Sequence, residues 1–377
     1  MQILELNDLS LTLYSSQGAV IRSEPAATAS HNGELIFGHG ALARSRISPQ
    51  LFNSRYLGNP AAQVLPSPIG AAHNLADLIY HHLRDYPVEE PLAVLTPSHF
   101  SNEQLGLFLG ICQELGIKIR GFVDLGLVQS LAAPLESDYH FIDIEWHRLT
   151  LSQLQARDGH LSVVGHRVWE GRGLNHLLEG WMGVVADQFM QRTRFDPLHR
   201  GDTEQQLFQQ TYAWLKDGLN LRVSIQGADS DRDLDVEVER LKDKTQQRLE
   251  GLDFDPDTPL LLSDRVKGIP FLADNLKRIH DRVAEADSDR SLKSYLSEVC
   301  QELPQDAVTR LSTTRIRRHP DQVSAITPIP ALSSSTTHLL DADYMAHPVA
   351  AFDLANRPQP GEQVRLNDQT YTAIAVT

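Results

Sequence analysis

The chain has 377 residues, 41% of them hydrophobic and 22% charged, so we expect a soluble globular protein of two or more lobes. Its 34 Lys and Arg against 49 Asp and Glu give a net charge of −15, which argues against nucleic acid or anionic membrane as a partner. No apolar run approaches the ~20 residues that span a bilayer. The N-terminus lacks a signal-peptide pattern, and Cys112 and Cys300 are too few for a disulfide framework, so a cytoplasmic location is expected.

Alternating apolar residues over 2–14 predict two strands with a turn near Asn7-Asp8, because both residue types tolerate left-handed backbone. The elements predicted next are a strand at Ala19–Arg22, a strand at Glu34–Phe37 after the hairpin dipeptide Asn32-Gly33, and a helix at Gly38–Arg46. They are followed by a helix at Ala71–Tyr86, a strand at Pro91–Thr96, a helix from its cap Ser101 to Leu115, a strand at Ile117–Ile119 and a helix at Leu125–Ala133. This order predicts an α/β fold with a mixed sheet.

The stretch Tyr139–Leu154 predicts two strands joined by the tight turn Glu145-Trp146-His147-Arg148, and a partner strand at His160–Val168 follows the turn dipeptide Asp158-Gly159. A phosphate-binding hairpin would carry glycines in its turn, because only a backbone without side chains lets several N–H groups approach a phosphate. Here bulky and charged side chains stand in their place. The turn therefore has the setting of a nucleotide site, with the phosphate-binding part filled.

The second half of the chain predicts a further set of alternating elements. Helices are expected at Leu174–Arg192, Thr203–Leu215, Arg240–Leu252 and Phe271–Ala284, and strands at Leu219–Gln226, Leu234–Val238 and Leu260–Ser263. The stretch Thr327–Thr377 is rich in Ser, Thr and Pro and contains one predicted hairpin that turns at Asn367-Asp368. We therefore predict a first lobe over 1–170, a second lobe over 171–326 and a small β-rich extension over 327–377.

Several short strings occur in the order in which a known family carries them. They are ELIFGHGA at Glu34–Ala41, TPSHFSNEQ at Thr96–Gln104, the segment Gly116–Ala132, the stretch Leu219–Leu252 and LLLSDRVKGIPFLADNL at Leu260–Leu276. Over roughly residues 1–280 the chain thus resembles the nucleotide-binding domain of the DnaK-type (seventy-kilodalton heat-shock) chaperones, within the actin and sugar-kinase superfamily. The resemblance implies a two-lobed actin-like ATPase fold, with duplicated mixed-sheet domains around a cleft.

The resemblance also implies where the first phosphate motif, the catalytic lysine and the NEP motif of the family fall in this sequence. The first phosphate motif, DLGTTNS, falls on residues 5–11, where Glu5 replaces the metal-side aspartate, Asn7 the glycine and Asp8 the first threonine. The catalytic lysine of the family falls on Ser54, and the glutamate of its NEP motif falls on Leu125. The implied phosphate site has therefore lost its cation and its positioned hydroxyl groups.

The second phosphate motif and the adenosine motif are altered in a similar way. The motif DLGGGT falls on 143–148 and keeps only its aspartate, so the implied phosphate-side positions are Asp143, Glu145, Trp146, His147 and Arg148. Positions that the resemblance leaves as candidates for nucleotide binding are Asp264 and Arg265 (in place of paired glycines), Gly268, Pro270, and the glycine pair Gly171 and Gly173.

These replacements indicate a pseudo-ATPase. Phosphoryl transfer needs oriented donors, cations and a metal held by carboxylates. Acidic side chains at Asp8 and Glu145 would repel a triphosphate by roughly 4 kcal/mol per charge pair at ~4 Å and an effective dielectric of about 20. We therefore expect no cofactor. The expected role is that of a scaffold or protein-interaction protein, with a protein partner of unspecified identity. Binding of ATP or ADP with Mg²⁺ stays open, since the adenosine side is less altered. Too few residues remain for the peptide-binding module of the family.

Two other functions stay open at this point. One is a genuine ATPase or small-molecule kinase of the same superfamily with relocated catalytic groups, in which Asp8 and Asp143 would hold magnesium. The other is a regulatory partner of a true chaperone that imitates its nucleotide-bound lobes. Phosphate release would distinguish the first, and co-purification with a chaperone or its exchange factor the second.

Single features near the central hairpin allow alternatives. Asp143 and Glu145 form either an acid/base pair or ion pairs with Arg148 or Arg167. Trp146 is either a plug in the former phosphate site or an exposed aromatic for binding. Gly171-x-Gly173 is either a nucleotide-binding pair or a turn that starts a helix.

Neither candidate metal motif has the required spacing. The aspartates 229, 231, 233 and 235 suggest an EF-hand, but Leu234 stands at the glycine position and Arg240 at the glutamate position, so a solvated hairpin tip is preferred. His140, His147, His160 and His166 do not have zinc-ligand spacing. No metal is expected.

Overall fold

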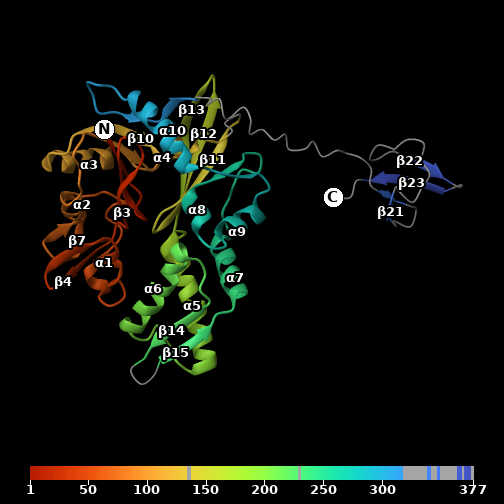
Figure 1. Cartoon of the computed structure of the whole chain (residues 1–377), viewed down its shortest axis with the longest axis horizontal. Coiled ribbons are helices and arrows are strands. Elements are labelled where there is room, and N and C mark those ends of the chain that lie inside the picture. Colours follow the sequence, from red (N-terminus) through yellow and green to blue (C-terminus); the bar gives the residue numbers. More distant parts are fainter. Residues whose placement is uncertain are drawn as a thin grey trace. The chain divides into compact units, whose positions relative to one another are not determined.

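The computed structural model describes residues 1–133, 137–227 and 231–316, together with four strands nearer the C-terminus (Figure 1). The chain folds into two compact units, Met1–Arg317 and Arg318–Thr377. The division falls a few residues before the expected start of the C-terminal extension at 327. The expected border between two lobes at 170/171 lies within the first unit and stays a prediction.

The first large sheet is mixed, as predicted. Its strands, in spatial order, are β18 (Arg310–Leu311), β10 (Ile119–Asp124), β9 (Leu92–Thr96), β1 (Gln2–Glu5), β2 (Leu11–Tyr14) and β3 (Val20–Glu24). β1, β2 and β3 form an antiparallel meander, whereas β9 runs parallel to β1 and β10 parallel to β9. Both β1 and β9 are entirely buried, which is the expected environment for central strands covered on both faces.

The second large sheet repeats this arrangement. Its strands, in spatial order, are β17 (Val283–Glu285), β16 (Leu260–Leu262), β11 (Tyr139–Ile144), β12 (Arg148–Arg157), β13 (His160–Glu170) and β19 (Thr313–Arg315). β11, β12 and β13 form an antiparallel meander, and β16 and β17 add to β11 in parallel. Five strands of each sheet therefore share one topology, a three-stranded meander with two later parallel strands beside its first strand, and the sixth strand lies on opposite edges, as β18 next to β10 and as β19 next to β13. The predicted α/β class with mixed sheets is confirmed.

Helices cover both faces of the sheets. The longer ones are α2 (Leu75–Arg84), α3 (Asn102–Glu114), α4 (Leu125–Ser130), α5 (Leu174–Thr193), α6 (Gly201–Asp217), α7 (Val238–Leu249), α9 (Leu272–Ile279) and α10 (Ser288–Gln301). Short ones are α1 (Gly38–Leu42), α8 (Asp264–Gly268) and the 3-10 turn η1 (Pro49–Leu51). Small antiparallel sheets are formed by β4 (Thr28–His31) with β5 (Glu34–Phe37) and β6 (Phe52–Asn53), by β7 (Val64–Ile69) with β8 (Ala72–Asn74), and by β14 (Arg222–Gln226) with β15 (Asp231–Asp235).

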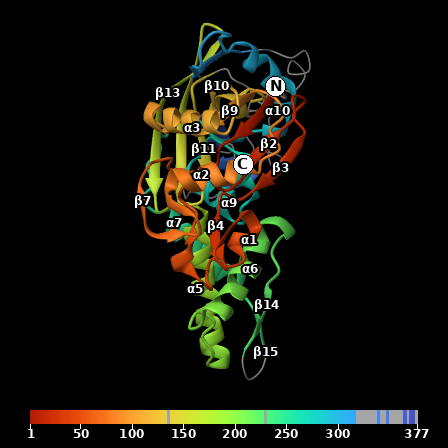
Figure 2. The ribbon, with the colours of Figure 1, turned by 90° about the vertical axis from the view of Figure 1, so that its left-hand side faces the viewer.

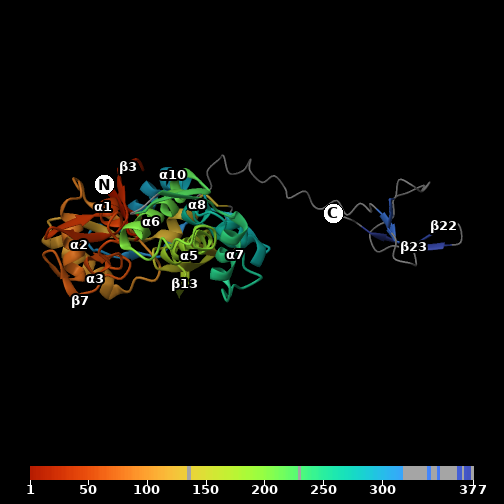
Figure 3. The same ribbon diagram turned by 90° about the horizontal axis from the view of Figure 1, so that it is seen from below.

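The core of the first unit consists of three apolar clusters. α2 and α3 pack on one face of the first sheet, where Leu4 and Val94 meet Phe108 (Figure 2). α5 and α7 lie side by side (Figure 3), and together with α9 they share an apolar cluster with the second sheet. The third cluster joins the two sheets, because Ile3 and Phe141 pack with side chains of α4 and α10 such as Tyr295. This shared core holds the C-terminal ends of β1 and β11 near each other.

Several predicted boundaries are wrong for identifiable reasons. The helix expected at Phe271–Ala284 ends at Ile279, since His280 has extended backbone and residues 283–285 pair with β16. The strand expected at Leu234–Val238 is β15 at Asp231–Asp235, where antiparallel pairing with β14 fixes its place. The helix expected at Ala71–Tyr86 starts only at Leu75, after Asn74 forms a capping box with Asp77. The cap at Ser101 and the hairpin at Asn32-Gly33 are confirmed.

The second unit contains a four-stranded antiparallel sheet. Its order is β21 (Ala346–Pro348), β20 (His338–Leu340), β23 (Gln369–Ile374) and β22 (Gln363–Leu366). β22 and β23 form the predicted hairpin, and its expected turn Asn367-Asp368 lies outside the described residues. Among the residues that the structure describes, no helix has the length and apolarity that a membrane crossing needs.

Candidate functional site

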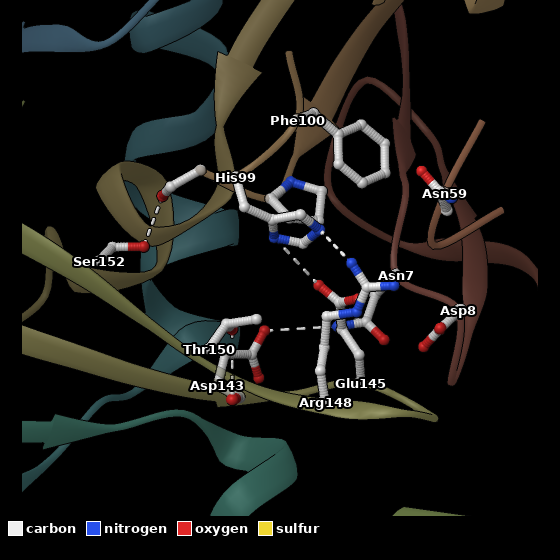
Figure 4. Close-up of polar contacts among 12 residues, drawn as sticks. Asn7, Asp8, Asn59, His99, Phe100, Asp143, Glu145, Arg148, Thr150 and Ser152 are labelled. Atoms are coloured by element: carbon white, nitrogen blue, oxygen red, sulfur yellow. Dashed lines mark hydrogen bonds and ion pairs between the residues drawn. The ribbon is translucent and has the colours of Figure 1, made fainter. Parts of the chain in front are cut away.

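The turns that follow β1 and β11 meet at the boundary between the two sheets (Figure 4). Asn7 Nδ2 donates hydrogen bonds to Asp143 Oδ2 (3.4 Å) and to the Ile144 carbonyl oxygen (3.2 Å). The Trp146 amide donates to Asp8 Oδ1 at 2.5 Å. Both turns follow the first strand of a meander, so the repeated topology brings equivalent positions of the two halves together. The structure thus joins Asn7, Asp8, Asp143 and Trp146 in one site.

Arg265 lies between the acidic residues that end β1 and β11. Its Nε donates to Asp143 Oδ1 at 3.0 Å and its Nη2 to Asp143 Oδ2, while its Nη1 donates to Glu5 Oε1. Glu5 is 1% exposed and also accepts from the Tyr14 hydroxyl at 2.9 Å. Ser263 Oγ donates to Asp143 Oδ1 at 2.7 Å. Although burial alone lowers it, the Asp143 and Glu5 carboxylates raise the pKa of Arg265 well above its usual value. Both carboxylates therefore share one fixed cation.

Asp8 and Glu145 form a second buried acidic pair in this site. A Cβ atom added to Gly58 would contact side-chain oxygens of both residues, so the two carboxyl groups lie near each other beside this glycine. Asp8 Oδ2 and both Glu145 side-chain oxygens have no hydrogen-bond partner among the described residues. Burial raises the pKa of Asp8 to about 6, against the Trp146 hydrogen bond that lowers it. Burial and then the Asp8 charge raise the pKa of Glu145 well above its usual value. At least one of the two is expected to be protonated at acidic pH.

His99 and Arg148 border this acidic pair. Arg148 Nε lies 3.4 Å from Glu145 Oε2, and His99 Nδ1 lies 3.5 Å from Glu145 Oε1. Arg148 Nη1 is 3.1 Å from His99 Nε2. Burial and the nearby Arg148 charge lower the pKa of His99 to about 3, so its ring is neutral at physiological pH. Arg148 is thus the positive group closest to Glu145.

The N-terminus of α5 is already occupied by the central hairpin. The amides of Leu174 and Asn175 donate to the carbonyl oxygens of Glu145 (3.0 Å) and Trp146 (2.9 Å). A Cβ atom on Gly173 would lie 2.6 Å from the Glu145 carbonyl oxygen and closer still to the Arg148 nitrogen. The Gly171 amide donates to the His147 carbonyl oxygen at 3.0 Å. Gly171 and Gly173 therefore form a turn that starts a helix. The first amides of this helix, which have no partner within it, donate to carbonyl groups of the central hairpin in place of an anion.

Ser54 and His147 come together although they are far apart in the chain. Ser54 Oγ lies 3.0 Å from His147 Nε2, and both residues are buried. Burial and the charge of Arg55 lower the pKa of His147 to about 3. The pair borders a cavity of about 240 Å³ whose wall also includes Trp146. Trp146 is only 3% exposed, so the alternative of an exposed binding aromatic is wrong.

The remaining predicted positions lie outside this cluster. Leu125 is the first residue of α4 and is buried in the apolar core that joins the two sheets. Asp264 pairs with Lys267 one helical turn away. Gly268 and Pro270 border a cavity of about 250 Å³ next to Trp214. Arg265 is thus the member of the predicted adenosine side that contacts the carboxylates.

The acidic residues of the predicted motifs form ion pairs with arginines. Glu145 pairs with Arg148 as one alternative expected, whereas Arg167 pairs with Asp253 and contacts neither acid. Asp229 lies outside the described residues; Asp231, Asp233 and Asp235 lie on β15, where Asp233 pairs with Arg222. No group of three or more residues that could hold a metal ion occurs within the described ranges.

The sequence did not single out His99 or the bridging role of Arg265. His99 follows the buried strand β9, and Arg265 follows the buried strand β16, which pairs in parallel with β11. Polar side chains just beyond the carboxyl ends of parallel strands converge at one edge of a sheet. That signal was available in the sequence, but choosing between the candidates required the strand order.

The Asp8–Glu145 pair predicts a specific pH dependence of stability. The folded-state pKa of Asp8 lies above the ~3.9 of an unfolded Asp, so its contribution to the free energy of unfolding falls as the pH rises from ~4 to ~6. Asn can still accept the Trp146 hydrogen bond. We therefore expect the free energy of unfolding of Asp8→Asn, relative to that of the wild type, to rise by roughly 2–3 kcal/mol as the pH rises across this interval. Urea unfolding at several pH values would measure the gain.

The buried histidines act in the opposite direction in both proteins. His99 and His147 have lowered folded-state pKa values, so their contribution to the free energy of unfolding is lost as the pH falls below ~6.5. This effect is the same in the variant and the wild type, so it cancels when their free energies of unfolding are subtracted. Asp85→Asn, at a side chain that is 61% exposed, is the matched control and should give no comparable gain. A difference between Asp8→Asn and wild type that stays constant with pH would contradict the assignment.

No protein-family model matches the chain, and the search of curated proteins finds no match either.

Proposed function

We propose that this protein is a DnaK-like, actin-like pseudo-ATPase that serves as a protein-interaction or scaffold protein. The observation that carries the proposal is the position of Arg265, whose guanidinium lies between Glu5 and Asp143. In the resembled family, acidic residues at these two positions stand on the metal and phosphate side of the nucleotide. Here the chain supplies its own cation to them.

The repeated sheet topology supports the fold part of the proposal. Each large sheet contains a meander with two parallel strands added beside its first strand, and the first strands β1 and β11 end at the same boundary. A duplicated mixed sheet around a cleft is the arrangement that the resemblance implies. The strings that carry the resemblance also fall on matching elements, since Thr96–Gln104 connects β9 to α3 and Leu260–Leu276 covers β16 to α9.

The residues at the expected phosphate site do not fit Mg²⁺ with a nucleotide. The amides at the start of α5 bind the carbonyl oxygens of Glu145 and Trp146, and Arg265 forms ion pairs with both Glu5 and Asp143. The buried acidic pair of Asp8 and Glu145 would face the triphosphate with like charge. Oriented donors are what phosphoryl transfer requires most, and here they are already bound.

A free strand edge supports a protein partner. β13 pairs with β12 along its length, but β19 covers only His160–Ser162 of its other side. No other described strand pairs with the remaining residues of β13, and Val164 is 57% exposed there. An exposed edge of this kind can accept an extended segment of another protein through main-chain hydrogen bonds.

Calorimetric titration tests the nucleotide part of the proposal. We expect neither ATP nor ADP with Mg²⁺ to give saturable heat at micromolar concentrations, and no phosphate release above background. A genuine DnaK-type chaperone measured in the same buffer is the positive control. Micromolar affinity for either nucleotide would overturn the filled-site proposal.

One observation favours an alternative, an ATPase or small-molecule kinase with relocated groups. Asp8 Oδ2 and both Glu145 carboxylate oxygens are buried without a hydrogen-bond partner among the described residues, and such oxygens are suitable ligands for Mg²⁺. This alternative predicts phosphate release that Asp143→Asn abolishes. Specific co-purification with a chaperone or its exchange factor would instead favour a regulatory partner of a chaperone.

A further inference from the structure

A cavity of about 240 Å³ lies beside the filled site, and both halves of the first unit contribute to it. Segment 45–55 forms one wall; the other is formed by the central hairpin, α5 and α6. The two walls are held together by polar contacts, because the Arg46 amide donates to Gln205 Oε1 (2.8 Å) and Gln205 Nε2 donates to the Leu42 carbonyl oxygen (2.9 Å). The cavity is therefore already formed in the folded first unit.

The two arginines of the cavity wall have different roles. Arg46 is already neutralised, since Glu179 and Glu204 each lie 3.6 Å from its Nη1 and its guanidinium covers the Phe208 ring. Arg55 is exposed and forms no ion pair with a described residue. Its charge nonetheless reaches the interior, because it lowers the pKa values of Asp8 and His147. Arg55 is thus an uncompensated cation at this cavity.

The rest of the lining combines apolar and polar surfaces. The half-buried Phe52 and the edge of Trp146 provide aromatic surface, while Asn53 and Ser54 provide polar groups next to Arg55. His147 is neutral because its pKa is lowered to about 3, and Arg46 is shared by Glu179 and Glu204, so Arg55 is the cation of the lining that is available to an anion. The volume is below the ~300–1,000 Å³ of pockets for drug-sized ligands, which limits the occupant to a small molecule.

We propose that this cavity binds a small organic anion, with its single oxyanion (a carboxylate or a phosphate monoester) on Arg55 and its apolar body against Phe52 and the edge of Trp146. Arginine binds both oxyanions through its planar fork of N–H donors, so the cavity alone does not distinguish them. Because both walls contact the ligand, its binding stabilises the folded first unit by mass action. This site is separate from the expected phosphate site and does not depend on the pseudo-ATPase proposal.

Three probes that each carry one phenyl ring test the proposal on the full chain. Benzoate and phenyl phosphate carry the two oxyanions, and benzyl alcohol is their neutral counterpart. Binding is followed by calorimetry and by tryptophan fluorescence, with Trp146→Phe identifying the signal from the cavity. We expect saturable binding of benzoate or phenyl phosphate and a change of fluorescence that is lost in Trp146→Phe. The probe that binds more tightly identifies which of the two oxyanions the cavity prefers.

Arg55→Met should weaken the binding of the better probe about tenfold, which corresponds to ~1.4 kcal/mol. The side chain is exposed, so the variant is expected to fold, and thermal unfolding checks this. Arg84→Met, at another exposed arginine outside the cavity wall, is the matched control and should leave the affinity unchanged. The proposal is overturned if neither anion binds saturably at millimolar concentration, if Arg55→Met binds as tightly as the wild type, or if benzyl alcohol binds equally well.

Discussion

Replacing Arg265 by Met is expected to lower the free energy of unfolding by about 3–5 kcal/mol, the cost of leaving buried carboxylates without their partner. Glu5 is 1% exposed, and the side chain of Asp143 is 7% exposed. Without the guanidinium, two negative charges from different sheets would face each other in a poorly solvated site. Urea unfolding at neutral pH measures the loss.

Two further variants show whether the loss comes from the buried charges. Arg167→Met removes an exposed ion pair with Asp253 and should cost at most about 1 kcal/mol. Adding Glu5→Gln and Asp143→Asn to Arg265→Met removes the unpaired charges and should recover most of the lost stability. A loss for Arg265→Met no larger than that for Arg167→Met would refute the role assigned to Arg265.

Gly173→Ala is expected to destabilise the protein by about 3 kcal/mol, at the upper end for overpacking, because the clash is with backbone. The added Cβ would meet the main chain of 145–148, which cannot rotate away as a side chain would. Relief requires the start of α5 to move, and that breaks the hydrogen bonds from Leu174 and Asn175 to the hairpin. The measurement is the free energy of unfolding in urea.

Gly183→Ala provides a control in the same helix. A Cβ at Gly183 has no neighbour within 4 Å, so the substitution should raise stability by about 0.5–1 kcal/mol through helix propensity alone. Opposite signs for the two variants are therefore expected. If both stabilise the protein, then α5 and the hairpin do not pack as closely as the structure indicates.

The predicted site agrees with the structure where local chemistry decides the conformation. Asn7 and Asp8 form a turn because Asn7 Oδ1 accepts from the Leu9 amide, an interaction available within the segment itself. The central hairpin follows from alternating apolar residues on β11 and β12. The prediction that its turn is filled by side chains requires only the residue types in that turn.

The parts that sequence reasoning missed depend on strand order. Arg265 was placed with a possible nucleotide, but the parallel pairing of β16 with β11 puts it beside Asp143. His99 reaches Glu145 because β9 lies next to β1 in the first sheet. Neither contact leaves a signal in local periodicity, because the partners are at least 46 positions apart in the chain, roughly the length of one βαβ unit or longer.

The sequence by itself determined the α/β class, most of the helices and strands of the first unit, and the presence of bulky and charged groups in the two turns. These features follow from hydrophobic periodicity, capping residues and turn chemistry, which act over a few neighbouring residues. Only the tertiary structure decided that Arg265 pairs with Glu5 and Asp143, that Asp8 lies near Glu145, and that Gly173 lets the hairpin pack against the start of α5. Such contacts arise from the packing of the two sheets around a shared core, and that packing depends on the whole chain at once.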